Sequence, residues 1–167
     1  MWTVGVSSGS QGIGGVMELN TMRFGRIKIK DQEIITLPEG LIGFPELSRF
    51  ALLRSQEADN SPFTWLQSLD DGSMAFVVCD PDFVRPDFKQ DLELSLDDQV
   101  LAVVTIPQDP KKITANLKAP IVFNKESKTG KQIILKNDKY STRHFIEQER
   151  EAHREVDCGQ GAKGKTR

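Results

Sequence analysis

Hydrophobic and polar side chains alternate in short stretches along most of the chain. Residues 26–30 alternate with a period of two, Asp31 and Gln32 supply a turn, and residues 33–37 return, which predicts an N-terminal hairpin with one face in water. Short stretches rich in apolar or β-branched residues predict further strands at residues 50–54, 63–69, 74–79, 100–106, 113–117, 121–124 and 132–136, of which 63–69 also places alternate residues on one face. Residues 80–94 contain two prolines and several aspartates, so we expect a loop there with at most an edge strand.

The turns between these stretches favour an all-β fold. Asp70-Asp71-Gly72-Ser73 is typical of a hairpin turn joining 63–69 to 74–79, and Gly130 is predicted in another turn. Ser95 is predicted to cap one helical turn before residues 100–106, a β-branched run suited to a central strand. Phe63 and Trp65 share a strand face and are predicted core residues. Many short strands at close spacing predict a two-sheet sandwich or a partly closed barrel.

The two ends of the chain differ from its centre. Residues 1–21 are rich in glycine and serine and carry one charge, so they are predicted to be a flexible extension. Residues 22–145 are predicted to form the folded β domain. Residues 146–167 are predicted to be a charged tail, partly helical or disordered, because their apolar stripe is thin.

Composition excludes several classes of function. The 167 residues are 38% hydrophobic and 28% charged, with a net charge of −2, so a protein dedicated to binding nucleic acid is disfavoured. No stretch is long and apolar enough to span a bilayer. Cys79 and Cys158 lie in unrelated contexts, which favours a reducing compartment, and no charged secretory region precedes Arg23. We therefore expect a cytoplasmic protein without a membrane partner.

Candidate catalytic and ligand motifs are weak. Residues 159–166 match the phosphate-loop pattern G-x-x-x-x-G-K-[ST], but only Arg167 follows, so the helix that this chemistry needs is missing. His144 and His153 lack metal-ligand spacing, and both are expected to be exposed or capping residues. Paired aspartates fall in turns, where their side chains bond the local backbone. The sequence thus predicts no catalytic site, cofactor or metal.

Several segments together resemble the flagellar assembly factor FliW family. The segments are IITLPEGLIGFPELSRFALL (34–53), SPFTWLQSLDD (61–71), AFVVCDP (75–81), ITANLKAPIVFN (113–124), GKQIIL (130–135) and YSTRH (140–144). They occur in order across nearly all of residues 22–145. The resemblance implies a compact β pseudobarrel without enzymatic activity, and a start near Met22.

The resemblance also implies two protein partners. Members of the family hold cytoplasmic flagellin, whose termini are amphipathic helices, and bind the translational repressor CsrA, so that flagellin export frees the factor to relieve repression. A monomer is expected when neither partner is bound. The acidic turns at residues 70–71, 80–82 and 97–98 are candidates for steering a basic partner. The candidate contact residues, taken as exposed, are Asn116, Lys118, Tyr140, Ser141, Thr142 and Arg143, with Asp80 and Asp82 as weaker candidates.

Two other classes of function stay open at this point. A direct RNA-binding β domain would need a basic strand face, and only Arg26, Lys28 and Lys30 approach one. A small carboxylate-dependent enzyme would need two acids converging in one pocket.

Overall fold

Two antiparallel sheets and few helices make up the described part of the chain. The computed structural model describes residues 14–55 and 60–160. The strands are β1 (Val16–Thr21), β2 (Gly25–Lys30), β3 (Ile35–Thr36), β4 (Arg49–Leu53), β5 (Phe63–Ser68), β6 (Ala75–Cys79), β7 (Asp98–Thr105), β8 (Thr114–Asn124), β9 (Gly130–Gln132) and β10 (His144–Phe145). The helices are α1 (Pro81–Val84) and α2 (Ile146–Gln160), with 3₁₀ turns at Asp31–Glu33, Phe88–Asp91 and Pro110–Lys112. The predicted all-β class is confirmed.

The smaller sheet corrects the predicted N-terminal hairpin. β2 pairs with β1 and not with residues 33–37, because Asp31–Glu33 forms a 3₁₀ turn that directs the chain into the other sheet. Residues 16–21 are therefore ordered strand, although the sequence placed them in a flexible extension. Met17 and Leu19 alternate on the inner face of β1 and pack on the cluster around Ile29, which supplies the burial that the glycine-rich composition concealed.

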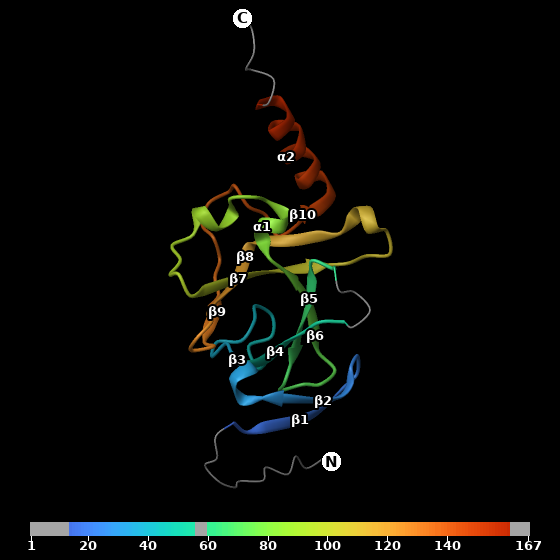
Figure 1. Cartoon of the computed structure of the whole chain (residues 1–167), viewed down its shortest axis with the longest axis vertical. Coiled ribbons are helices and arrows are strands. Elements are labelled where there is room, and N and C mark those ends of the chain that lie inside the picture. Colours follow the sequence, from blue (N-terminus) through green and yellow to red (C-terminus); the bar gives the residue numbers. More distant parts are fainter. Residues whose placement is uncertain (1–13, 56–59, 161–167) are drawn as a thin grey trace, which may run out of the picture.

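The larger sheet follows the chain almost in order. Its strands run β10–β8–β7–β6–β5–β4–β3, with β9 also paired to β8, and each neighbouring pair is antiparallel. The predicted hairpin of β5 and β6 and the central position of β7 are confirmed. In Figure 1 the β1–β2 hairpin lies at one end of the molecule, and α2 projects from the other.

Four local predictions were wrong. Residues 81–84 and 88–91 form short helical turns, because Asp80 caps the first one by accepting the Asp82 amide at 2.9 Å. Residues 95–97 form a turn without the predicted helix. The two strands predicted on either side of Pro120 are one strand, β8, and Gly130 begins β9 and does not lie in the turn before it.

Two large clusters of buried apolar side chains, contributed largely by strands of the larger sheet, form the main core. One surrounds Phe50 and Leu66, and the other surrounds Phe88 and Leu117. Trp65 is only half-buried, which corrects its predicted place in the core. It lies on the opposite face of β5 from Leu66, in a cavity lined by the β1–β2 hairpin and the end of β4.

Asp70 has a structural role that the sequence did not reveal. Its carboxylate accepts the backbone N–H groups of Ser48 and Arg49 and the Arg49 Nε, each at 2.8 Å. Burial alone would raise the pKa of this carboxyl, but the hydrogen bonds from Arg49 and Ser48 outweigh it and hold the pKa below its ordinary value of 3.8. Asp70 thus ties the β5–β6 turn to the start of β4.

The helix α2 begins as the sheet ends at β10. Ile146 is buried in the cluster around Phe88, so the first turn is anchored in the core. The predicted tail is helical as far as Gln160, whereas the rest of the phosphate-loop pattern, at residues 161–166, lies outside the described residues.

Candidate functional site

An irregularity in β8 opens a groove beside the larger sheet. Leu101 of β7 lies opposite Ile121, but Val103 lies opposite Asn116, so β8 carries extra residues over this span. The Asn116 side chain accepts the Ala119 amide at 3.0 Å, which closes the turn of extra backbone. A side chain that bonds its local backbone is what such a turn requires.

The groove is an apolar cavity of about 340 Å³ with exposed isoleucines on its rim. Ile42 is 56% exposed and Ile134 is 65% exposed, both high for side chains of this kind. The floor and walls are formed by Leu41, Phe44, Phe76, Val103 and Ala119, and the polar lining by Asn116, Lys118, Gln132 and Thr142. Three of the eight candidate residues from the sequence therefore meet at one place.

Gln132 holds the two walls of this groove together, although the sequence did not mark it as a candidate. Its Oε1 accepts the Ile42 amide at 2.8 Å, and its Nε2 donates to the Ala119 carbonyl at 2.9 Å. Both partners are backbone groups from other elements, so no local motif signals this role. The groove depends on a glutamine that only the folded chain identifies.

The 140–144 segment is partly buried, which corrects two predictions. Tyr140 was taken as exposed but is buried, with its ring against Phe88 and its hydroxyl donating to Asp91. His144 is also buried. Its Nε2 accepts the Ser141 amide at 2.8 Å, so the proton lies on Nδ1, which faces Glu149 at 2.8 Å.

Only one of the exposed residues of this segment lines the groove. Ser141, Thr142 and Arg143 are all exposed, as expected. Of the three, Thr142 lines the groove. The Ser141 carbonyl accepts the Lys118 amide at 3.0 Å, which places the segment beside β8.

Asp80 and Asp82 face a cation of their own chain. Lys89 Nζ lies 2.5 Å from Asp80 and 3.5 Å from Asp82. Burial lowers the pKa of Lys89, but the hydrogen bond and charge of Asp80, with those of Asp82, outweigh it and raise the pKa. Lys89 therefore offsets one of the two negative charges, and neither carboxylate is among the residues that line the groove.

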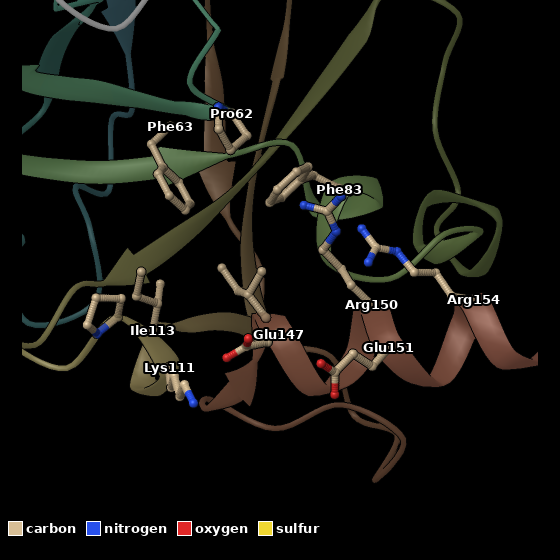
Figure 2. Close-up of a pocket in the computed structure, with 11 residues that line it drawn as sticks. Pro62, Phe63, Phe83, Lys111, Ile113, Glu147, Arg150, Glu151 and Arg154 are labelled. Atoms are coloured by element: carbon tan, nitrogen blue, oxygen red, sulfur yellow. The ribbon is translucent and has the colours of Figure 1, made fainter.

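A second cavity, of about 500 Å³, lies between α2 and the ends of β5 and α1. Figure 2 shows Arg150 and Arg154 reaching from α2 towards Phe83, and the Arg150 guanidinium lies 4.2 Å from the centre of the Phe83 ring. Phe63 forms an edge-to-face pair with Phe83 at 6.2 Å, so this face of α2 covers aromatic side chains. The aromatic floor corrects the predicted core position of Phe63, which is half-buried.

The described ranges 14–55 and 60–160 lack two other kinds of feature, a metal-binding cluster and a membrane-spanning helix. No group of three or more His, Cys, Asp and Glu side chains there is arranged to hold a metal ion. No helix in the same part of the chain is long and apolar enough to cross a membrane. Cys79 is buried, and burial, with the charge of Asp80, raises the pKa of its thiol to about 12.

Comparisons with known proteins agree on one family. A family model described as FliW protein matches residues 18–146. A flagellar assembly factor FliW of Ruminiclostridium cellulolyticum is 39% identical over 140 residues, covering 78% of this chain and 94% of the relative. One from Caldanaerobacter subterraneus is 42% identical over 143 residues, covering 80% and 95%. A crystal structure of the flagellar assembly factor FliW superposes with a TM-score of 0.68 at 29% identity, covering 78% of this chain and 96% of that one.

Proposed function

The chain belongs to the FliW family of flagellar assembly factors, and we propose that it holds flagellin in the cytoplasm and exchanges it for the translational repressor CsrA. The family is a class of assembly factors and not a class of enzymes. A holder of this kind needs surfaces for two proteins and no chemical step. Because one factor is shared, the free concentration of each partner sets the occupancy of the other.

The exposed isoleucines at the groove are the observation that carries the flagellin proposal. An amphipathic helix docks by laying an apolar stripe into a hydrophobic groove while polar groups engage its flanks. Ile42 and Ile134 line the groove together with Phe76, and both isoleucines are more than half exposed. Lys118 and Thr142 supply polar groups at the border. This combination suits the amphipathic terminal helices that the family resemblance implies for flagellin.

An acidic surface on another part of the sheet suits the basic repressor. Glu93 and Asp98 border a cavity of about 580 Å³ over β8 and β9, where Asp91 is paired with Lys139. Leu96, in the loop between Glu93 and Asp98, is 99% exposed. Acidic groups around an exposed apolar side chain favour rapid association with a basic surface that offers an apolar contact. We place CsrA binding at this loop. Of the three acidic turns that the sequence suggested, only residues 97–98 then remain a candidate contact, and residues 70–71 and 80–82 do not.

Charge and size changes at the groove test the flagellin proposal. Ile42→Asp and Ile134→Asp should each weaken binding of purified flagellin by at least about tenfold in calorimetry, because each buries a carboxylate against apolar atoms. Ile106→Asp is the matched control, since Ile106 is 49% exposed and lies outside the groove. Thermal unfolding confirms that each variant is folded. Unchanged affinity in folded groove variants would contradict the proposal.

The repressor surface has its own test. Glu93→Lys combined with Asp97→Lys should slow association with CsrA and reduce its dependence on salt. Glu39→Lys combined with Glu46→Lys serves as the control with the same change in charge, because both residues are exposed and neither lines this cavity. If the control slows association as much as the pair does, the loop is not the contact.

A further inference from the structure

Three arginines and a tryptophan share one cavity at the mouth between the two sheets. Arg23 comes from the β1–β2 turn, Arg26 from β2 and Arg54 from the end of β4, and all three are exposed. They surround Trp65 of β5. The cavity measures about 660 Å³, and its other lining residues are Phe24, Ile27, Leu53 and Ser55.

The tryptophan holds one of these cations in place. The Arg23 guanidinium lies 3.8 Å from the centre of the Trp65 ring. Phe24 packs its edge against the same ring at 6.2 Å, with the planes at 76°. A guanidinium stacked on an aromatic face keeps all its N–H groups at its edge, where they can still bond a ligand.

Two of the three charges have no carboxylate partner in the described part of the chain. Arg26 bonds Glu18 of β1, which also approaches Lys28 at 3.3 Å. Arg23 and Arg54 form no ion pair with any residue of the described ranges. Within the described ranges 14–55 and 60–160, the cavity thus presents two guanidinium groups without a carboxylate partner beside an apolar wall.

We propose that this cavity binds an acidic segment of a protein partner, with a carboxylate bonded by Arg23 and Arg54 and an adjacent apolar side chain packed against Trp65. Guanidinium groups bond carboxylates through paired N–H groups, which gives direction as well as attraction. Tryptophan and arginine are also the residues most enriched among those that dominate protein–protein binding energy. The site is separate from the groove at Ile42 and from the acidic loop at Leu96, and it does not depend on the assignments made for them.

A nucleic acid is the less suitable occupant. A phosphate backbone needs cations that follow its track, but Glu18 of β1 lies beside the cations of β2 and pairs with Arg26 and Lys28. The chain as a whole carries a net charge of −2, so it does not attract polyanions over a distance. The apolar wall of Ile27 and Leu53 suits a side chain.

Trp65 itself reports on the site. The full-length chain with Trp2→Phe retains Trp65 as its only tryptophan. The probe is a capped peptide in which glutamates alternate with leucines, titrated while Trp65 emission is followed. A peptide with lysine in place of glutamate and a short oligouridylate are titrated in parallel. The paired substitution Arg23→Gln and Arg54→Gln removes the proposed contacts, and Lys125→Gln, at an exposed position in the β8–β9 turn, is the matched control.

The expected result is a saturable change in emission with the acidic peptide alone. The arginine pair variant should raise Kd at least about tenfold, and Lys125→Gln should leave it unchanged. Raising salt from about 50 to about 300 mM should weaken binding. The proposal is overturned if the acidic peptide gives no saturable change, if the folded pair variant keeps its affinity, or if oligouridylate binds as tightly as the peptide. Arg54→Gln alone leaves the Arg23–Trp65 stack intact. If the double variant does not fold, the same titration of this single variant still tests the proposed contact, and an unchanged Kd contradicts it.

Discussion

Replacing Tyr140 tests whether this residue acts in the core or at a partner surface. Its side chain is 2% exposed, its ring packs edge-to-face on Phe88 at 4.7 Å between centres, and its hydroxyl donates to Asp91. Tyr140→Ala empties a site in a packed cluster, and truncation of a buried aromatic costs about 3–5 kcal/mol. In a chain of this size about 1 kcal/mol lowers Tm by roughly 2–4 °C, so the expected fall is on the order of 6–20 °C.

Tyr140→Phe separates the hydroxyl from the ring. It removes one hydrogen bond, worth about 0.5–1.5 kcal/mol. Asp91 keeps its ion pair with Lys139, so we expect a cost at the lower end of that range.

The assay is urea and thermal unfolding followed by circular dichroism, with Thr142→Ala as an exposed control from the same segment. A Tyr140→Ala protein whose free energy of unfolding lies within about 1 kcal/mol of the wild-type value would refute the reasoning, because truncation of a fully packed aromatic side chain destabilises a protein by more than that. Wild-type stability with lost partner binding would restore Tyr140 as a contact residue.

Three further predictions concern the framework of the fold. The pKa of Asp70 is lowered in the folded state, so its stabilisation is present above the unfolded pKa near 3.8 and disappears as pH falls through the folded value. Asp70→Asn should therefore be less stable than the wild type at pH 7, with the gap closing in acid, as denaturant midpoints across pH would show. Gly40→Ala should cost about 1–3 kcal/mol in urea unfolding, because Gly40 has φ +69° and a Cβ would lie 2.5 Å from the Phe44 carbonyl oxygen. A fragment of residues 22–145 should fold but melt below a fragment of 14–160, since it lacks β1 and α2; equal melting temperatures would show that neither element adds stability.

Local patterning was enough to predict most strands of the larger sheet. The short stretches at 50–54, 63–69 and 74–79 became β4, β5 and β6, because brief apolar-rich runs bounded by turn residues are typical of half-buried or buried strands. The turn at Asp70–Ser73 was also predicted, since its residues favour that backbone locally. The N-terminal hairpin was paired wrongly because strand pairing depends on partners beyond the turn, and Met17 and Leu19 were hidden in a glycine-rich segment.

The candidate site was predicted only in part. Asn116, Lys118 and Thr142 do meet at the groove, whereas Asp80 and Asp82 pair with Lys89. Gln132 was missed because both of its partners are backbone atoms of other elements. Exposure of a residue such as Tyr140 cannot be read from polarity alone, since a tyrosine hydroxyl needs just one partner to be buried.

The amino-acid sequence by itself determined the all-β class, the order of most strands and the family, because each is encoded by the types of residues that follow one another along the chain. Tertiary structure alone decided which surfaces exist. The groove arises where β8 carries more residues than β7, and the cationic cavity arises where Arg23 of the β1–β2 turn and Arg54, just after β4, line one cavity with Trp65. Residues 62–69 contain no lysine or arginine, so the sequence around Trp65 predicted no such site. Contacts between distant segments depend on the register and packing of both sheets, which local pattern does not specify.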